Sequence, residues 1–174
     1  MLSRRLPTED VVQALGIGPA DKYNITIEQA FRKPADITTN GNLQRMFLDQ
    51  VIFNTLIGNA DAHAKNYSIL LRPDHIALAP LYDEAPLALY PQYVQDLAMR
   101  IAGARQARAV GLSRWRKLAK RLGIDTDALS ARVQKIAISV AEYNNEALIS
   151  LESAQTKMLT ACTGRNVEKA LSEN

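Results

Sequence analysis

The sequence predicts a mainly α-helical domain with a short β-hairpin beside one polar loop. Apolar residues recur at helical spacing in residues 42–57 and again from Asp127 onward, where no proline interrupts the pattern. Between these regions, 67–71 and 76–79 are short β-type runs joined by a turn. A chain of 174 residues with 47% hydrophobic content can bury one core, so we expect one domain spanning residues 1–174.

Two short helices are expected in the first forty residues. Thr8 can cap a helix that runs to Leu15. The Gly16–Pro19 stretch is predicted to be a turn, because its glycines lack the preceding strand that a phosphate-binding loop requires. Thr26 can cap a second helix, which we expect to end before Pro34, since the residue before a proline disfavours helical geometry.

The clearest helical pattern runs from Asn42 to Ile57. Gly58 follows directly and is well placed to end the helix in a left-handed conformation. We interpret Asn54, which lies on the apolar face just before the loop, as a buried side chain bonded to the loop backbone. The expected inner face consists of Leu43, Met46, Phe47, Gln50, Val51, Asn54 and Ile57, widened by Phe53 and Leu56.

The C-terminal third is expected to be helical. A helix over about Ser113–Leu122, capped by Ser113, should stop at Gly123. From Asp127 the apolar stripe predicts one long helix, or two helices that meet near Asn144-Asn145. A pair of helices packed on the core is favoured over a coiled-coil partner at this length. The polar tail after Thr163 is predicted to fray.

Composition excludes several classes of protein. The single cysteine, Cys162, excludes an internal disulfide framework and a cysteine-based zinc site, and we expect it to be a buried inert thiol. No apolar run approaches the ~20 residues that span a bilayer, and the first ten residues lack an apolar signal core. We therefore predict a cytoplasmic protein without a membrane partner. The formal net charge of +3 does not by itself indicate a partner.

One stretch concentrates chemically active side chains. Asp61, His63, Lys65 and Asn66 fall within six residues between the predicted helix and the hairpin, and Asp83 follows the hairpin. The D-x-x-x-x-N spacing of Asp61 and Asn66 matches the catalytic loop of protein kinases, where the acid receives the substrate hydroxyl proton and the amide holds magnesium. A carboxylate and an amide oxygen suit Mg²⁺, whose remaining ligands are phosphates and waters. This predicts Asp61 as catalytic base and Asn66 with Asp83 as magnesium ligands.

The other two loop residues have less specific roles. Lys65 could balance the charge of a transferring phosphoryl group. His63 could orient the loop or hydrogen-bond Asp61, and a purely structural histidine that ties a tight loop is equally consistent with the pattern.

These residues stand within a longer resemblance. G-N-A-D-A-H-A-K-N-Y-S-I-L-L followed by L-A-P-L-Y-D resembles the catalytic core of the HipA family of serine/threonine kinases, the toxin halves of bacterial toxin–antitoxin pairs. The resemblance extends to R-L-P-T-E-D-V-V-Q-A-L-G and K-Y upstream and to L-A-M-R-I-A-G downstream, and covers roughly residues 4 to 122.

The resemblance implies a fold, a reaction and partners. The fold is a helical, protein-kinase-like C-terminal lobe with the hairpin beside the catalytic loop. The reaction is transfer of the ATP γ-phosphoryl group to a protein hydroxyl, with Asp61 matching the base and Asn66 and Asp83 the Mg²⁺ ligands. The implied substrates include aminoacyl-tRNA synthetases, and the implied partner is a helix-turn-helix antitoxin that binds operator DNA.

One feature departs from the family pattern. A nucleotide-binding lobe needs a sheet of on the order of 50 residues, before any helix is added. Only 60 residues precede Asp61, and they are predicted to be helical. We therefore expect a C-terminal lobe without the N-terminal ATP-binding lobe: a fragment, a short protein that needs that lobe in trans, or a non-catalytic relic. ATP would bind only with a complementing lobe.

Two other classes of function stay open at this stage. The segment from Arg100 to Arg121 holds eight bases and no acid, so a binding module for tRNA or DNA is one alternative, and bases that neutralise acids elsewhere in the fold are the other reading. Asp61, His63 and Asp83 could instead ligate a hydrolytic metal.

Overall fold

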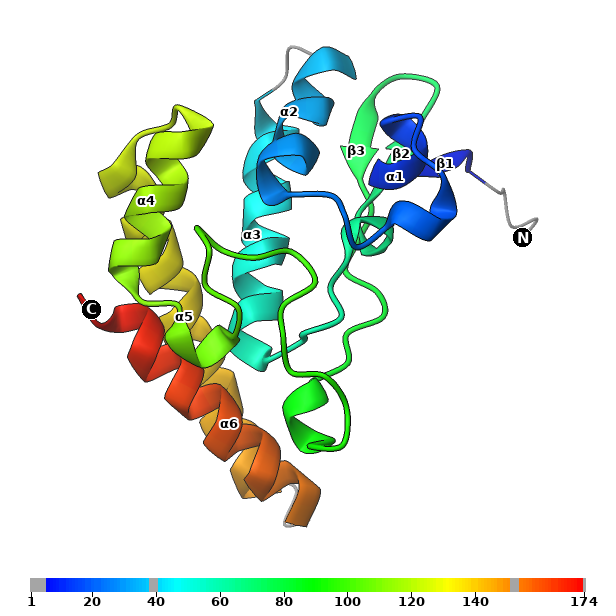
Figure 1. Ribbon diagram of the computed structural model, residues 1–174. Helices are drawn as coiled ribbons and strands as arrows, with labels where there is room; N and C mark the ends of the chain where they lie inside the picture. The colour runs from blue at the N-terminus through cyan, green and yellow to red at the C-terminus, as the bar shows by residue number, and fades with distance from the viewer. Residues whose placement is uncertain (1–5, 38–40, 151–153, 174) are drawn as a thin grey trace.

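A computed structural model describes residues 6–37, 41–150 and 154–173, which form six α-helices and a three-stranded sheet (Figure 1). This confirms the mainly α-helical fold with a small β element. None of the described helices combines the length and the apolar character needed to cross a membrane. The elements are β1 (Thr8–Asp10), α1 (Val11–Ala14), α2 (Ile27–Ile37), α3 (Asn42–Ile57), β2 (Ser68–Leu71), β3 (Ile76–Leu78), α4 (Leu112–Leu122), α5 (Thr126–Ser150) and α6 (Ala154–Leu171).

Helix α3 is the central element, and it contacts α2, α5, α6 and β3. Both of its predicted ends are confirmed, and Gly58 closes it with φ 76° while its N–H bonds to helix carbonyls. Burial extends beyond the predicted face to Leu48, Ile52 and Thr55. The reason is that α3 has neighbours on several sides, so a single apolar stripe does not describe it.

The sheet confirms the hairpin and adds a strand that the sequence analysis missed. Strands β2 and β3 pair antiparallel, and β1 pairs antiparallel with the other edge of β2. The predicted helix start at Thr8 is therefore wrong. The cap is Asp10, whose carboxylate accepts the Gln13 N–H at 2.8 Å while the Gln13 side chain accepts the Asp10 N–H at 2.9 Å. The edge of β2 that β3 does not occupy offers hydrogen bonds, and the distant segment 8–10 satisfies them.

Two more helix boundaries correct the expectations. Thr26 caps α2 as predicted, because its hydroxyl accepts the Gln29 N–H at 3.2 Å, but the helix continues past Pro34 to Ile37. Proline removes one backbone donor and disfavours helical geometry before it; here that preference does not end the helix. Helix α4 starts after Gly111 without a side-chain cap, so Ser113 does not serve as the cap, whereas Gly123 ends α4 with φ 71° as expected.

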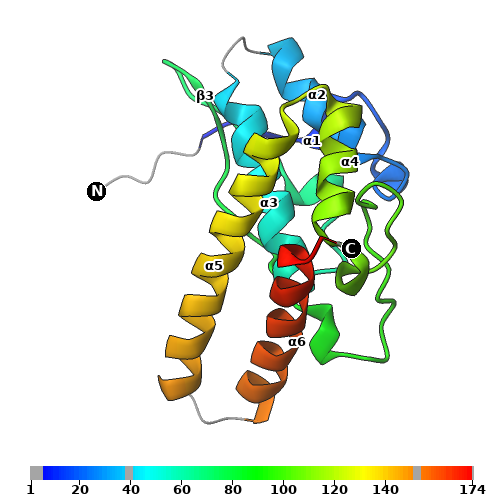
Figure 2. The ribbon, with the colours of Figure 1, turned by 90° about the vertical axis from the view of Figure 1, so that its left-hand side faces the viewer.

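The C-terminal region folds into two helices, α5 and α6, which lie side by side (Figure 2). Helix α5 ends at Ser150 and α6 begins at Ala154, so the expected junction near Asn144-Asn145 lies inside α5. The tail after Thr163 is not frayed, because Val167 and Ala170 are buried in the core. Val167 and Ala170 are three residues apart and so share one face of α6, and their apolar contacts hold this largely polar end of the helix on the core.

An ion pair also joins the helical layer to α3. Arg132 of α5 donates two hydrogen bonds, of 2.6 and 2.7 Å, to the two carboxylate oxygens of Asp49. This bidentate geometry fixes the orientation of both side chains. The ion pair thereby fixes the position of α3 relative to α5. The loop that follows α3 therefore begins at a rigid helix.

Candidate active site

The polar loop leaves α3 at Gly58 and enters β2 at Ser68. Asn59 holds its start: its amide donates to Asn54 Oδ1 at 2.8 Å and to the Asp83 carbonyl at 3.3 Å. Asn54 is only 3% exposed, but its bonds go to the Asn59 side chain and to the Gln50 carbonyl, not to the loop backbone that we had expected. At the other end, the Tyr67 ring packs 4.9 Å from that of Phe47.

Asp61 lies partly exposed in this loop, and among the described residues one side chain hydrogen-bonds to it. The hydroxyl of Tyr23 donates to Asp61 Oδ1 at 2.9 Å. Tyr23 comes from the segment before α2, and it is 52% exposed. The bond orients the carboxylate and leaves its other oxygen available to a substrate group.

Asn66 and Asp83 meet across the hairpin. The buried Asn66 amide donates to Asp83 Oδ2 at 2.8 Å, and Asn66 Oδ1 accepts the His63 backbone N–H at 3.1 Å. Asp83 has a left-handed backbone with φ 60°, a conformation that aspartate adopts more readily than most residues. The structure therefore brings together the two side chains that the sequence singled out for Mg²⁺, with the amide nitrogen of Asn66 facing Asp83 and its oxygen facing the His63 N–H.

This donor set suits a cation that keeps most of its own ligands. One carboxylate and one amide oxygen fit Mg²⁺ completed by phosphates and waters. No group of three or more histidine, cysteine, aspartate or glutamate side chains in the described residues could hold a metal ion. The hydrolytic site of Asp61, His63 and Asp83 is therefore not supported.

His63 is held by a lysine rather than by Asp61. Its ring is 7% exposed, and the Lys22 ammonium donates to Nε2 at 2.7 Å. This contact places the ring proton on Nδ1, which has no partner. Burial, and then the charge of Lys22, lower the pKa of His63. The geometry favours a neutral, structural histidine that connects the loop to the segment before α2.

Lys65 is half-buried in the loop, and its role as a charge for the phosphoryl group stays a prediction. Within the described part of the chain its ammonium makes no ion pair, and only its carbonyl takes part, accepting the Tyr82 hydroxyl at 2.6 Å. Lys22 is a second cation at this loop, which it contacts through His63. The sequence analysis named Lys22 and Tyr23 only as the K-Y of the family resemblance and gave them no role. No local pattern could assign one, because they lie 41 and 38 residues from their partners His63 and Asp61.

A second acid beside Asp83 was also missed. Glu84 is half-buried, and its Oε2 atom has no hydrogen-bond partner. Burial, and to a lesser extent the negative charge of Asp83, raise the pKa of Glu84. In the sequence no spacing pattern singled out this glutamate beside Asp83.

We predict that the free energy of unfolding falls as pH drops below about 6.5, and that His63 contributes to this fall. The pKa of His63 in the folded state is lowered from its ordinary value of about 6.5, so the unfolded chain binds the proton more readily. The stabilisation is present above that value and is lost as pH falls toward the folded-state pKa. Urea denaturation at several pH values measures the free energy of unfolding of the unsubstituted chain and of His63→Gln. If this free energy depends on pH equally in both proteins, the prediction is contradicted.

The basic segment from Arg100 to Arg121 is partly neutralised within the fold. Three of its arginines pair with acids from elsewhere in the chain, and Arg114 donates to the Ala102 carbonyl at 3.1 Å. This favours bases that neutralise acids over a nucleic-acid surface. The pairs are Arg105 with Asp96, Arg116 with Glu173, and Arg121 with Glu28.

Comparison with known proteins places this fold in a family. The family model of the HipA-like C-terminal domain matches residues 2–143. "Putative kinase Y4mE" of Sinorhizobium fredii is 33% identical over 143 residues, which are 79% of this chain and 34% of that protein. "Serine/threonine-protein kinase toxin HipA" of Shewanella oneidensis is 27% identical over 158 residues, 82% of this chain and 36% of that protein.

A solved structure agrees with these relatives. The Shewanella oneidensis toxin–antitoxin system of HipA, HipB and operator DNA contains a chain that matches with a TM-score of 0.79 and 22% identity. The match covers 95% of this chain and 43% of that one. The chain spans about a third of the length of the curated relatives that it matches. The chain belongs to the family of HipA-like C-terminal domains.

Proposed function

We propose that this chain is the C-terminal catalytic lobe of a HipA-like serine/threonine protein kinase that acts as the toxin of a toxin–antitoxin pair. The observation that carries the proposal is the contact at 2.8 Å between Asn66, which is on the same loop as Asp61, and Asp83, which follows the hairpin. A proton acceptor and two oxygen donors for magnesium are the parts that this lobe contributes to phosphoryl transfer. Family membership supports the assignment.

Each residue has a defined role in the proposal. Asp61 receives the proton of the substrate hydroxyl on the oxygen that Tyr23 leaves unoccupied. Asn66 and Asp83 hold Mg²⁺, which when bound neutralises charge on the phosphates of ATP. Lys22, through His63, keeps the loop in place. Lys65, half-buried in the same loop, contributes a positive charge toward the phosphoryl group.

The proposal requires an N-terminal lobe to hold ATP. Among the described residues before Asp61 there is one strand, β1, and it pairs with β2 of the hairpin instead of building a nucleotide-binding sheet. Phosphoryl transfer depends on positioning and electrostatics, so ATP turnover needs that lobe, in the same chain or in trans. The proposed substrate is a protein such as an aminoacyl-tRNA synthetase. The proposed partner is a helix-turn-helix antitoxin, and the proposed compartment is the cytoplasm.

The metal site can be tested on the chain by itself. We expect Mn²⁺, a paramagnetic substitute for Mg²⁺, to broaden the NMR signals of the Asn66 side-chain amide selectively. Asp83→Asn removes the carboxylate charge and is expected to abolish this broadening, because one amide oxygen alone holds the cation poorly.

Asp74→Asn is the matched control, since Asp74 is an exposed aspartate in the turn of the same hairpin. Broadening centred away from Asn66, or unchanged in Asp83→Asn, would contradict the metal assignment. Excess Mg²⁺ should reverse the effect by competition.

A further inference from the structure

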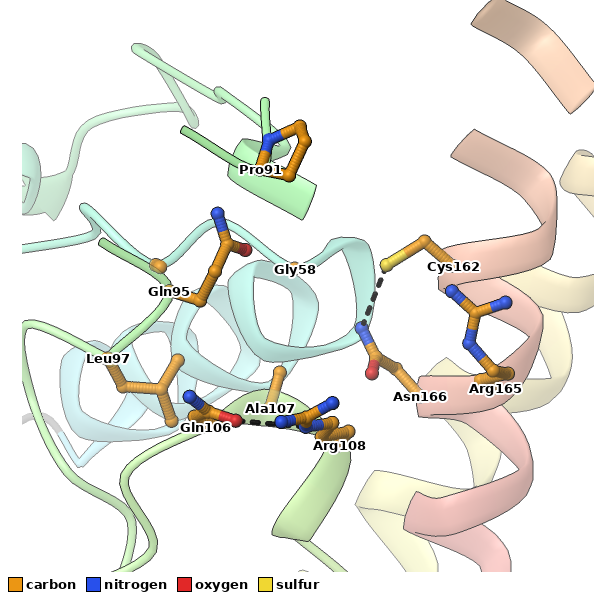
Figure 3. Close-up of a pocket in the computed structure, with 11 residues that line it drawn as sticks. Gly58, Pro91, Gln95, Leu97, Gln106, Ala107, Arg108, Cys162, Arg165 and Asn166 are labelled. Carbon is orange, nitrogen blue, oxygen red and sulfur yellow. Dashed lines mark hydrogen bonds between the residues drawn. The ribbon is translucent and has the colours of Figure 1, made fainter. Parts of the chain in front are cut away.

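A second cavity lies apart from the candidate active site. It has a volume of about 290 Å³, and Asp61, Asn66 and Asp83 do not line it. Figure 3 shows Cys162, Arg165 and Asn166 on α6 facing Gln95 and Leu97 across the cavity, with Arg108 along a third side. Gly58 and Ala60, at the start of the polar loop, complete the wall.

The charge around this cavity is positive and uncompensated. Arg108 and Arg165 both line it, and no acid does. Arg108 Nε donates to the neutral Gln106 amide oxygen at 2.9 Å, and Arg165 contacts the Cys162 thiol. Within the described ranges neither makes an ion pair. Four other arginines differ in this respect, since Arg105, Arg116, Arg121 and Arg132 each pair with an acid.

The rest of the lining is fixed rather than loose. Asn166 is 4% exposed, and its amide donates to the Leu56 carbonyl at 3.1 Å, which leaves its oxygen directed toward the cavity (Figure 3). Gln95 donates to the carbonyls of Leu87, Tyr90 and Tyr93 at 3.0, 3.2 and 3.0 Å, so the rim segment is tied down. The apolar part of the wall, between the polar groups, consists of Pro91, Leu97 and Ala107.

We infer that this cavity binds a small phosphate monoester that carries a flat or apolar body. Guanidinium groups recognise phosphate oxygens through charge-assisted hydrogen bonds, and two of them match a dianion better than a single carboxylate. The apolar wall accommodates the body, and a volume near 300 Å³ is at the small end of ligand sites. The inference does not depend on kinase activity.

Cys162 is half-buried, not the fully buried thiol that the sequence predicted. It can therefore serve as a reporter, because it is the only cysteine of the chain and it lines the cavity. Phenyl phosphate is the probe, and the rate of Cys162 alkylation by iodoacetamide is the measurement. At ten times its dissociation constant the probe is expected to slow alkylation about tenfold, since roughly a tenth of the chain is then free. Benzyl alcohol, which has the ring without the charge, should give no protection.

Substitutions locate the binding groups. The midpoint of protection is the phenyl phosphate concentration that halves the rate of Cys162 alkylation. Arg108→Gln and Arg165→Gln are each expected to raise this midpoint by about tenfold, the typical effect of losing one charge-assisted hydrogen bond. The midpoint is compared, not the rate, because Arg165→Gln also alters the surroundings of the thiol. Arg100→Gln, an exposed arginine outside the lining, is the matched control and should leave the midpoint unchanged.

Three results would overturn the inference: no protection by phenyl phosphate, equal protection by benzyl alcohol, or midpoints that neither arginine substitution moves. Inorganic phosphate tests the requirement for a body. If inorganic phosphate needs a severalfold higher concentration than phenyl phosphate for half-maximal protection, the apolar contact is supported. Equal concentrations overturn the claim that the site recognises an apolar body. Circular dichroism of each variant confirms that the comparison is between folded chains.

Discussion

Replacing Asp61 with asparagine is expected to lower the rate of phosphoryl transfer about 100- to 10,000-fold when the chain is supplied with its N-terminal lobe, the range typical of losing a general base. Asparagine keeps the shape of the side chain, and its oxygen can still accept the Tyr23 hydroxyl, which now bonds to Asp61 at 2.9 Å. It cannot take up a proton. The measurement is the initial rate of phosphate incorporation into a protein substrate, with KM determined separately.

Tyr23→Phe is the informative control for this prediction. It removes only the hydrogen bond that orients the carboxylate, so we expect a smaller loss of rate than with Asp61→Asn. The 174-residue chain alone should show little or no activity in either form, because the phosphate-positioning groups are supplied by the other lobe. Robust phosphorylation by the chain alone, abolished by Asp61→Ala, would contradict that requirement.

Trp115→Ala is expected to reduce the free energy of unfolding by about 3–5 kcal/mol, the usual effect of truncating a buried aromatic side chain. Trp115 on α4 is 0% exposed, the largest of the fully buried side chains. Its indole N–H has no hydrogen-bond partner, so the loss comes from apolar contacts and from the cavity left behind. Urea denaturation followed by far-ultraviolet circular dichroism is the appropriate measurement, because the variant lacks the only tryptophan.

Lys117→Ala is the matched control on the same helix. Its side chain is exposed, and substitutions at such positions usually change stability by no more than about 0.5 kcal/mol. Trp115→Phe, which keeps part of the ring volume, should fall between the two. A change below about 1 kcal/mol for Trp115→Ala would show that the α4 contacts contribute little to the core.

Local patterns predicted the elements that local interactions specify. The bounds of α3 followed from its helical spacing and from Gly58, because helical hydrogen bonds join residues four apart and a glycine readily adopts the left-handed end. The β2–β3 hairpin followed from two β-type runs and a turn. The hairpin also returns the chain toward the loop, so the meeting of Asn66 with Asp83 could be predicted from neighbouring residues.

Local patterns failed where the deciding partner is remote in the chain. The Thr8–Asp10 segment could have started a helix, and it became a strand because the edge of β2, sixty residues later, accepts its hydrogen bonds. The end of α6 looked polar, and it is helical because Val167 and Ala170 reach the core. In both cases the free energy of a tertiary contact outweighs the local preference.

By itself, the sequence determined the family, the loop with Asp61 and Asn66, the second acid Asp83 after the hairpin, and the central helix before the loop. Only the tertiary structure decided that Tyr23 orients Asp61, that Lys22 holds His63, and that Arg108 and Arg165 face one cavity. The physical reason is the same for all three. Spacing along the chain indicates which residues share a face of one element, whereas the packing of elements decides which faces meet.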